Sequence, residues 1–144
     1  MEPMLVGIFA AAICILLCSG AALLCIKTCA PALASVTAEK PELGSKLVIA
    51  IILGEALAIY GLLIAFMIIG RLPQTDLEAM QMLVSGITMG VTALLAAIGI
   101  SYCGPAMMTA AAENAESFTT NILGLVLSEA LAIYGLLISF MIIG

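Results

Sequence analysis

The sequence predicts an all-α membrane protein, with four transmembrane helices arranged as two tandem helical hairpins. Composition is the first reason: 65% of the 144 residues are hydrophobic and only 9% are charged, whereas soluble domains carry about 45–50% apolar and about 25% charged residues. Four long, almost uncharged segments and an internal repeat are the other two reasons. This composition excludes a soluble enzyme, because too few polar side chains are available to cover a water-soluble globule.

The first hairpin is expected within residues 1-72, with spans at about 4-27 and 47-70. The first span is free of charge up to Ile26, and the second contains a single charged residue, Glu55. Both exceed the roughly 18 apolar residues that indicate a transmembrane helix, and neither alternates between apolar and polar residues as a barrel strand would. The first residues lack the basic segment of a cleavable secretory signal, so we expect this span to stay in the mature protein.

The second hairpin is expected within residues 73-144, with spans at about 79-106 and 119-143. The third apolar segment continues to residue 112, which is longer than a bilayer requires, so this helix should tilt or project beyond the lipid. The fourth span contains one charged residue, Glu129. Polar stretches connect the four spans, and connections this short make successive helices antiparallel neighbours.

A near-identical segment occurs in the second span of each hairpin. Residues 54–70 read GEALAIYGLLIAFMIIG and residues 128–144 read SEALAIYGLLISFMIIG. The aligned segments differ only at Gly54/Ser128 and at Ala65/Ser139. Because two spans separate equivalent positions, both hairpins run in the same direction, unlike the inverted repeats of many secondary transporters.

Charge and residue usage limit the chemistry that the chain can perform. A formal net charge of −5 argues against nucleic-acid binding, which needs a basic surface. The absence of histidine removes the usual general base and the commonest metal ligand. The cysteines lie in apolar spans without an accessible Cys-x-x-Cys pattern, which favours a packing role for Cys14, Cys18, Cys25, Cys29 and Cys103. We therefore expect no catalytic residue, no metal site and no bound cofactor.

Two carboxylates inside the predicted spans carry the functional signal. Glu55 lies roughly 5 Å from the midpoint of its span at ~1.5 Å per residue, and Glu129 occupies the matching place in the second hairpin. A charge at this depth costs a few kcal/mol or more, so burial favours the protonated form. Such a group can stay protonated against lipid and release its proton when a polar path or a cation approaches. The alternative is a protonated glutamate that only joins helices, and the repetition of the motif favours a carrier.

Small residues in the first and third spans predict close helix packing. The third span contains Gly86-x-x-x-Gly90 and Ala93-x-x-x-Ala97, patterns that let helix backbones approach each other in lipid. The second and fourth spans are bulkier. Narrow inner helices and wider outer helices give the taper that a closed ring of copies requires.

These residues resemble a known family, the membrane proteolipid (the rotor-ring c or K subunit) of V-type and A-type rotary ATPases. The resemblance covers essentially the whole chain, and its most specific parts are the duplicated hairpin and the EALAIYGL motif at 55–62 and 129–136. The EKPE sequence at 39–42 is similar to the polar loop by which the family's ring contacts its central stalk. The resemblance therefore places the chain in the membrane, as one of many copies in a ring.

The resemblance also implies a mechanism and a set of partners. Spans one and three would line the inside of the ring, while Glu55 and Glu129 on the outer spans would each carry one ion as the ring rotates. A stator subunit would supply an arginine that forces ion release, and central-stalk subunits would contact the loops at 35-46 and 110-117. Soluble subunits would hydrolyse or synthesise ATP, because this chain has no phosphate-binding loop. Many V-type proteolipids keep a carboxylate in only one hairpin. The alternative is therefore that only one of the two glutamates carries an ion and that the other is vestigial.

The residues beside the glutamates favour H+ over Na+ as the carried ion. A sodium site needs several oxygen ligands, yet Ala56 and Ala130 directly follow the two glutamates. Tyr60 and Tyr134, five residues beyond, are expected to steady the carboxyl groups by hydrogen bonding, as the same position does in the family, or to act as aromatic anchors at the membrane interface. A sodium-coupled ring stays open as an alternative.

Two other function classes compete with the rotor ring. A small proton-coupled multidrug exporter also has four spans and a buried glutamate, but it needs aromatic residues for bulky cations and these are only 5% here. A structural, pore-forming proteolipid would work without either glutamate. The basic residues Lys27, Lys40 and Lys46 place the 35-46 loop in the cytoplasm and both termini outside. The lack of a targeting segment fits a prokaryotic plasma membrane.

Overall fold

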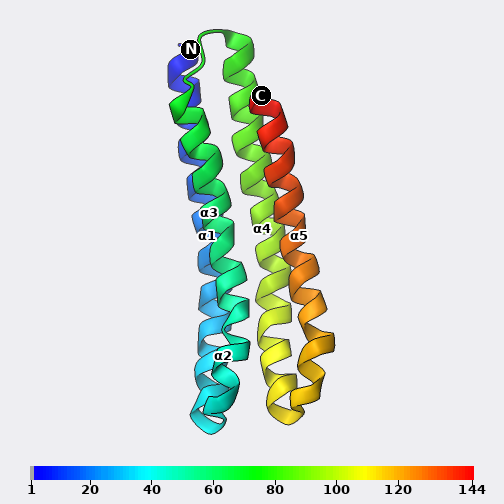
Figure 1. Cartoon of the computed structure of the whole chain (residues 1–144). Helices are drawn as coiled ribbons and strands as arrows, with labels where there is room; N and C mark the ends of the chain where they lie inside the picture. Colours follow the sequence, from blue (N-terminus) through cyan, green and yellow to red (C-terminus); the bar gives the residue numbers. More distant parts are fainter. Residues whose placement is uncertain (1) are drawn as a thin grey trace.

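The computed structural model describes residues 2–144 and is built from four long helices packed side by side (Figure 1). Each of the four is long and apolar enough to cross a membrane, which confirms the predicted all-α class. The long helices are α1 (Pro3–Glu39), α3 (Ile49–Gly70), α4 (Asp76–Glu113) and α5 (Phe118–Ile143). Short helical turns form the connections, namely η1 (Pro41–Leu43), α2 (Gly44–Leu47) and η2 (Ala115–Ser117).

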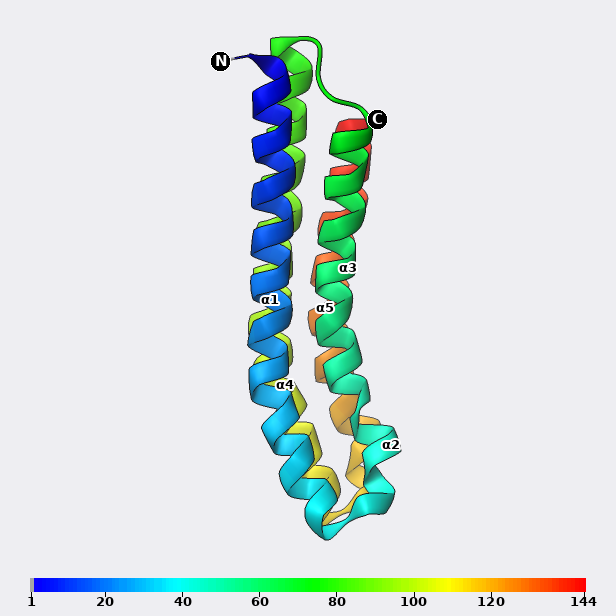
Figure 2. The same ribbon diagram turned by 90° about the vertical axis from the view of Figure 1, so that its left-hand side faces the viewer.

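The four helices form two layers. Figures 1 and 2 together show α1 beside α4 in one layer and α3 beside α5 in the other. The contact between α1 and α4 is more extensive than the contact between α3 and α5. Small residues explain this difference, because buried alanines, glycines and cysteines of α1 and α4 let their backbones approach closely. The taper expected from the sequence is therefore present, with a tight α1/α4 layer and a wider α3/α5 layer.

The structure corrects the extent of two connections. The segments 35-46 and 110-117 were expected to be loops, but α1 continues to Glu39 and α4 continues to Glu113. The first connection is then largely helical as well, because η1 and α2 occupy most of it. Both helix extensions are rich in alanine, the strongest helix former. The polar residues there continue the helix beyond the apolar segment and do not end it.

A proline lies inside α1, at Pro31, and inside α4, at Pro105. Proline removes one backbone hydrogen bond and bends a helix, and Figure 2 shows that the last part of α1 slants toward α2. In both helices a hydroxyl four residues later donates to the carbonyl of the proline, from Ser35 to Pro31 at 3.1 Å and from Thr109 to Pro105 at 3.0 Å. A proline and a hydroxyl four residues later therefore recur at matching positions of α1 and α4.

Buried thiols on α1 face the neighbouring helices. The Cys18 thiol donates to the Met89 carbonyl at 3.8 Å, and the Cys25 thiol donates to the Ala97 carbonyl at 3.8 Å, both on α4. Gly61 of α3 lies so close to Cys18 that a side chain at that glycine would collide with it. These cysteines therefore act as small packing residues where α1 contacts α4 and α3.

Basic side chains join the two hairpins at the ends of the bundle. The Lys40 ammonium donates to the carbonyl of Ala112, near the C-terminal end of α4. At the opposite end, the Arg71 guanidinium donates to the carbonyls of Ile143 at 3.5 Å and Gly144 at 3.2 Å, after the last turn of α5. Both contacts place a positive charge against unpaired helix carbonyls, which is the favourable arrangement at a helix C-terminus.

Candidate functional site

The Glu129 carboxyl lies between the two hairpins, within the middle part of α5. Its side chain is only 9% exposed. The Tyr60 hydroxyl of α3 donates a hydrogen bond to Glu129 Oε1 at 2.7 Å. The acid therefore comes from the second hairpin and its hydrogen-bond donor from the first, so the packing of α3 against α5 assembles the pair.

The residues that flank Glu129 add little polarity around its carboxyl. The Ser128 hydroxyl donates to the Gly124 carbonyl at 2.7 Å, one turn earlier in α5. Ala130 is half-buried and Ala132 is fully buried. Over residues 2–144, Tyr60 is the one side chain that hydrogen-bonds the Glu129 carboxyl. The site is thus a carboxyl in apolar surroundings with a single phenol partner.

Glu55 occupies the matching position of α3 in a different setting. Its side chain is exposed, and its neighbour Ala56 is half-buried. Tyr134, the counterpart of Tyr60 in the repeat, is 62% exposed on α5. Within the described part of the chain, neither Glu55 nor Tyr134 has a side-chain hydrogen bond. The two motifs are nearly identical in sequence, but only Tyr60 and Glu129 form a hydrogen-bonded pair within the described residues, whereas Glu55 and Tyr134 lie apart.

Helix geometry explains why each tyrosine does not reach the glutamate of its own motif. Five residues along a helix rotate the side chain by about 140°, whereas side chains that meet are three or four residues apart. Tyr60 therefore points away from Glu55 and toward the other hairpin. Sequence reasoning placed both tyrosines beside a carboxyl but missed this exchange between hairpins. The five-residue spacing between each glutamate and its tyrosine was the sequence signal that the two side chains do not meet on the same helix.

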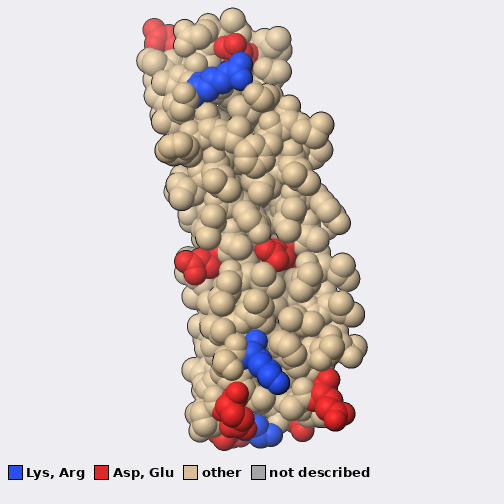
Figure 3. Space-filling model, in the orientation of Figure 1, with Lys and Arg blue, Asp and Glu red and all other residues tan. Residues whose placement is uncertain are grey.

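Charged atoms on the face seen in Figure 3 are distributed in three groups. Most lie near the two ends of the molecule, and two separate acidic spots lie at about mid-height in a wide apolar band. Glu55 and Glu129 are the acidic residues in the interior of α3 and α5. Both carboxylates therefore sit where a membrane would have its hydrocarbon, far from the charged ends.

Comparisons with known proteins place both hairpins in one family. The family model that describes the C subunit of ATP synthase matches the chain twice, over residues 9–68 and 83–142. The 16 kDa proteolipid of the V-type proton ATPase of Rattus norvegicus is 30% identical over 112 residues, covering 76% of this chain and 72% of that protein. The V-type proton ATPase proteolipid of Dictyostelium discoideum is 32% identical over 107 residues, covering 72% of this chain and 55% of that protein.

A third relative, a 16 kDa proteolipid of the V-type proton ATPase of Caenorhabditis elegans, is 32% identical over 108 residues, with 72% of this chain and 67% of that protein covered. These relatives are eukaryotic, so they lend no support to the prokaryotic plasma membrane expected from the sequence. The two segments matched by the family model fall on α1–α3 and on α4–α5.

Proposed function

Because the chain belongs to the family of ATP synthase C subunits, as a duplicated-hairpin proteolipid of the V-type rotor, we propose that it carries protons on Glu129 and Glu55. It is an integral, multi-pass and non-catalytic subunit, and other subunits perform the nucleotide chemistry. In this proposal many copies form a ring whose rotation moves each carboxyl from one access path to another. Rotation is then coupled to ATP hydrolysis or synthesis.

The buried Glu129–Tyr60 pair is the observation that supports this proposal. A carboxyl that is 9% exposed within an apolar helix is stable in its neutral form, because burying an unpaired charge is costly. The Tyr60 hydroxyl satisfies Oε1 at 2.7 Å, and the other carboxyl oxygen can hold the carried proton. A cation from a stator subunit, which we expect to be an arginine, would favour the carboxylate and so release the proton.

The polar groups near Glu129 favour a proton over a sodium ion. A hard cation is held by several oxygen ligands at once. Here the Tyr60 hydroxyl contacts the carboxyl, while the Ser128 hydroxyl is used by the backbone of α5. The names of the relatives also specify proton ATPases. Tyr60 would then fix the carboxyl in place, and Ala56 and Ala130 would keep the surroundings apolar.

The remaining assignments follow from the ring arrangement. We propose that residues 1–72 and 73–144 are its two hairpin units, with α1 and α4 lining the inside. The connections after α1 and α4 would face the cytoplasm and contact the central stalk, and both termini would lie on the other side. The cluster of Lys27, Lys40 and Lys46 near the first connection supports this orientation.

Carbodiimide labelling of the assembled complex tests the proposal, because the reagent attacks protonated carboxyls in apolar surroundings. Peptide mass spectrometry would quantify labelling of Glu129 and Glu55 over a range of pH, with sodium chloride or potassium chloride at equal ionic strength. We expect labelling to fall as pH rises and to be the same in both salts. Protection by millimolar sodium at fixed pH would identify sodium, and not the proton, as the carried ion. Absence of labelling at both glutamates would contradict the carrier role and favour a structural proteolipid.

A further inference from the structure

We propose that a hollow between α1 and α4 binds the phosphate group of an anionic phospholipid. The hollow has a volume of about 390 Å³, and four of the six residues that line it are polar. Two of the four come from each helix, namely Lys27 and Thr28 of α1 and Ser101 and Tyr102 of α4. The site depends only on the packing of these two helices, so it stands whether or not the glutamates carry protons.

The internal repeat aligns these four residues in two pairs. In the two halves of the sequence, Lys27 corresponds to Ser101, and the next residues, Thr28 and Tyr102, also correspond. Because α1 and α4 run in the same direction (Figures 1 and 2), corresponding residues lie at nearly the same level of the two helices. The Ser101 hydroxyl donates to the Leu24 carbonyl of α1 at 3.2 Å, which joins the helices at this level. The ammonium and the phenol therefore come from different helices but share one hollow.

Lys27 and Tyr102 supply the hydrogen-bond donors for a ligand. The Thr28 hydroxyl is used by its own helix, since it donates to the Leu24 carbonyl at 3.1 Å. The Lys27 side chain is exposed and Tyr102 is 78% exposed, and neither donates a side-chain hydrogen bond to another of residues 2–144. An ammonium and a phenol in one hollow match a phosphate group, whose charged oxygens accept strong hydrogen bonds.

The charges around Lys27 favour an anionic ligand. The acidic residues of α1 and α4 nearest to the hollow in sequence are Glu39 and Glu113, about three turns away. Glu55 and Glu129 belong to α3 and α5, in the other layer. An ammonium without a carboxylate partner beside hydrocarbon needs a counter-charge, because an unpaired charge is costly there. A basic pocket between two membrane helices on the cytoplasmic side is typical of sites for lipid head groups.

The hollow lies where the apolar surface of α1 and α4 ends. On α1, exposed large apolar side chains stop at Ile26, and on α4 they stop at Tyr102. From Lys27, α1 nevertheless continues for ~18 Å to Glu39, at ~1.5 Å per residue. Tyrosine and lysine are side chains that anchor helices at the level of the lipid head groups. The phosphate groups of a bilayer are therefore expected at the depth of Lys27 and Tyr102.

Apolar side chains one turn earlier on each helix offer a surface to the lipid tail. Leu23 precedes Lys27 by four residues, and Ile98 precedes Tyr102 by four. Residues at this spacing lie on the same face of a helix. Leu23 is 62% exposed and Ile98 is 52% exposed. Each helix thus presents a polar group next to an apolar one, in the same order as the phosphate and the acyl chains of a phospholipid.

Selective retention of lipid by the purified, detergent-solubilised ring tests the proposal. The ring is equilibrated with micelles that contain phosphatidylglycerol and phosphatidylcholine in equal amounts, and native mass spectrometry counts the lipids that stay bound. Lipid enclosed without a specific site would include both kinds, so the ratio between them is the measurement. We expect the parent ring to retain phosphatidylglycerol in clear excess. Equal retention of both lipids would mean an interfacial anchor only and would overturn the proposal.

Two lysine variants locate the site. Lys27→Met should reduce the retained phosphatidylglycerol several-fold and leave phosphatidylcholine unchanged. Lys46→Met is the matched control, because Lys46 is also exposed but lies on α2, outside the hollow. It should retain lipid as the parent ring does. Equal loss of phosphatidylglycerol in the two variants, or no loss in Lys27→Met, would contradict a site at Lys27.

Tyr102→Phe keeps the proposal testable if Lys27→Met rings fail to assemble. It removes only the phenol hydroxyl, so it should lower phosphatidylglycerol retention by less than Lys27→Met does, and an unchanged count would overturn the two-donor site. Millimolar sodium phosphate, compared with sodium chloride at equal ionic strength, distinguishes a lipid from free phosphate. Unchanged retention supports the lipid, whereas displacement by sodium phosphate would identify a site for the soluble ion and overturn the proposal.

Discussion

The two hairpins contain nearly the same glutamate motif, on α3 and on α5, but the helix contact beside the glutamate has its glycine on a different helix in each hairpin. In the first hairpin, Gly54 of α3 faces the side chain of Cys25 on α1. In the second hairpin, Ser128 of α5 faces Gly99 on α4. Each contact therefore has one glycine and one small side chain, but the glycine lies on α3 in the first hairpin and on α4 in the second. What is maintained is the distance between helices, not the identity of either residue.

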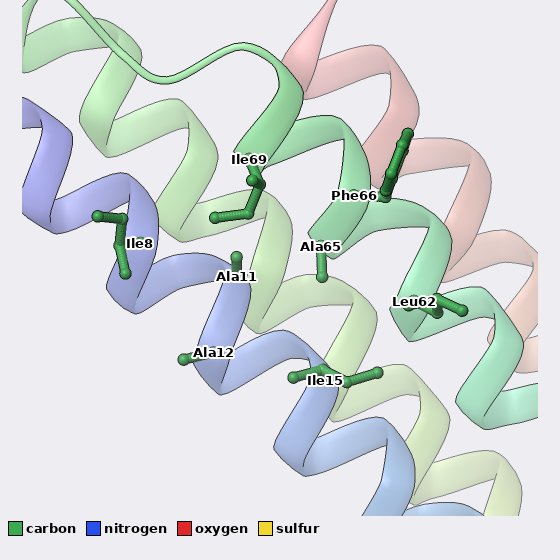
Figure 4. A pocket seen from close by; sticks show the side chains of 8 residues that line it. All are labelled: Ile8, Ala11, Ala12, Ile15, Leu62, Ala65, Phe66 and Ile69. Carbon is green, nitrogen blue, oxygen red and sulfur yellow. The ribbon is translucent and has the colours of Figure 1, made fainter.

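A second difference lies nearer the termini. The Ser85 hydroxyl donates to the Ser139 carbonyl at 3.0 Å, and the Ser139 hydroxyl donates to the Ser85 carbonyl at 2.9 Å. Both serines are fully buried between α4 and α5. The corresponding residues of the first hairpin are Ala11 and Ala65, which have no hydroxyl and line an apolar groove between α1 and α3 (Figure 4). The second hairpin is thus joined by a polar pair that the first one lacks.

Replacing each carboxyl separately should have the largest effect, and it tests whether the two glutamates have the same role. If both glutamates carry protons, Glu129→Gln and Glu55→Gln should each reduce ATP-driven proton uptake by proteoliposomes to the background level. An amide cannot release a proton, so every passage of that site past the stator would stop rotation. Normal uptake by the Glu55→Gln variant alone would show that Glu55 is vestigial and that Glu129 suffices. Ring assembly, measured by native mass spectrometry, is the control.

The glycine exchange predicts the next largest effect. Gly54→Ser should destabilise the ring by about 1–3 kcal/mol, because the new side chain collides with Cys25. Adding Cys25→Gly should recover most of this loss, since the double variant reproduces the Gly99–Ser128 contact of the second hairpin. Thermal dissociation of the detergent-solubilised ring measures both. An equal loss in single and double variants would mean that the two contacts are not interchangeable.

Removing one hydroxyl of the buried serine pair should cost about 1 kcal/mol. Ser85→Ala leaves the Ser139 carbonyl without its side-chain donor. The double variant Ser85→Ala, Ser139→Ala resembles the first hairpin and should cost less than the two single changes added together. A double-mutant cycle on thermal dissociation gives the coupling energy. Strict additivity would indicate that the two bonds act independently.

The smallest effect is expected at the connection between α1 and η1. Lys40→Met removes the donor to the Ala112 carbonyl at the end of α4 and should cost about 0.3–1 kcal/mol. Its counterpart in the repeat is Asn114, whose side-chain oxygen accepts from the Glu116 backbone at 3.0 Å. Hydrogen exchange at the last turn of α4 would report the change, with Lys46→Met as the matched charge control. Equal exchange in both variants would assign the effect to charge alone.

The sequence predicted the helices well where lipid decides their position. The long apolar segments predicted four helices able to cross a membrane, and the structure has them. The repeat predicts equivalent positions for Glu55 and Glu129 on α3 and α5. The ends of α1 and α4 were less predictable, because Ala-rich, polar residues up to Glu39 and Glu113 can form either a loop or a helix in water. The contact of this polar part of α1 with α4, including Lys40 with Ala112, helps to fix the helical choice.

By itself, the sequence determined that this protein is a duplicated helical hairpin in a membrane with one acid in the second long helix of each hairpin. Hydropathy and repetition are properties of residue order, and the cost of exposing backbone and charge to hydrocarbon turns them directly into structure. Only the tertiary structure decided that Tyr60 serves Glu129 while Glu55 and Tyr134 lie apart on opposite edges. That pairing depends on how each helix is rotated about its axis, and the close fit of small side chains between helices fixes the rotation.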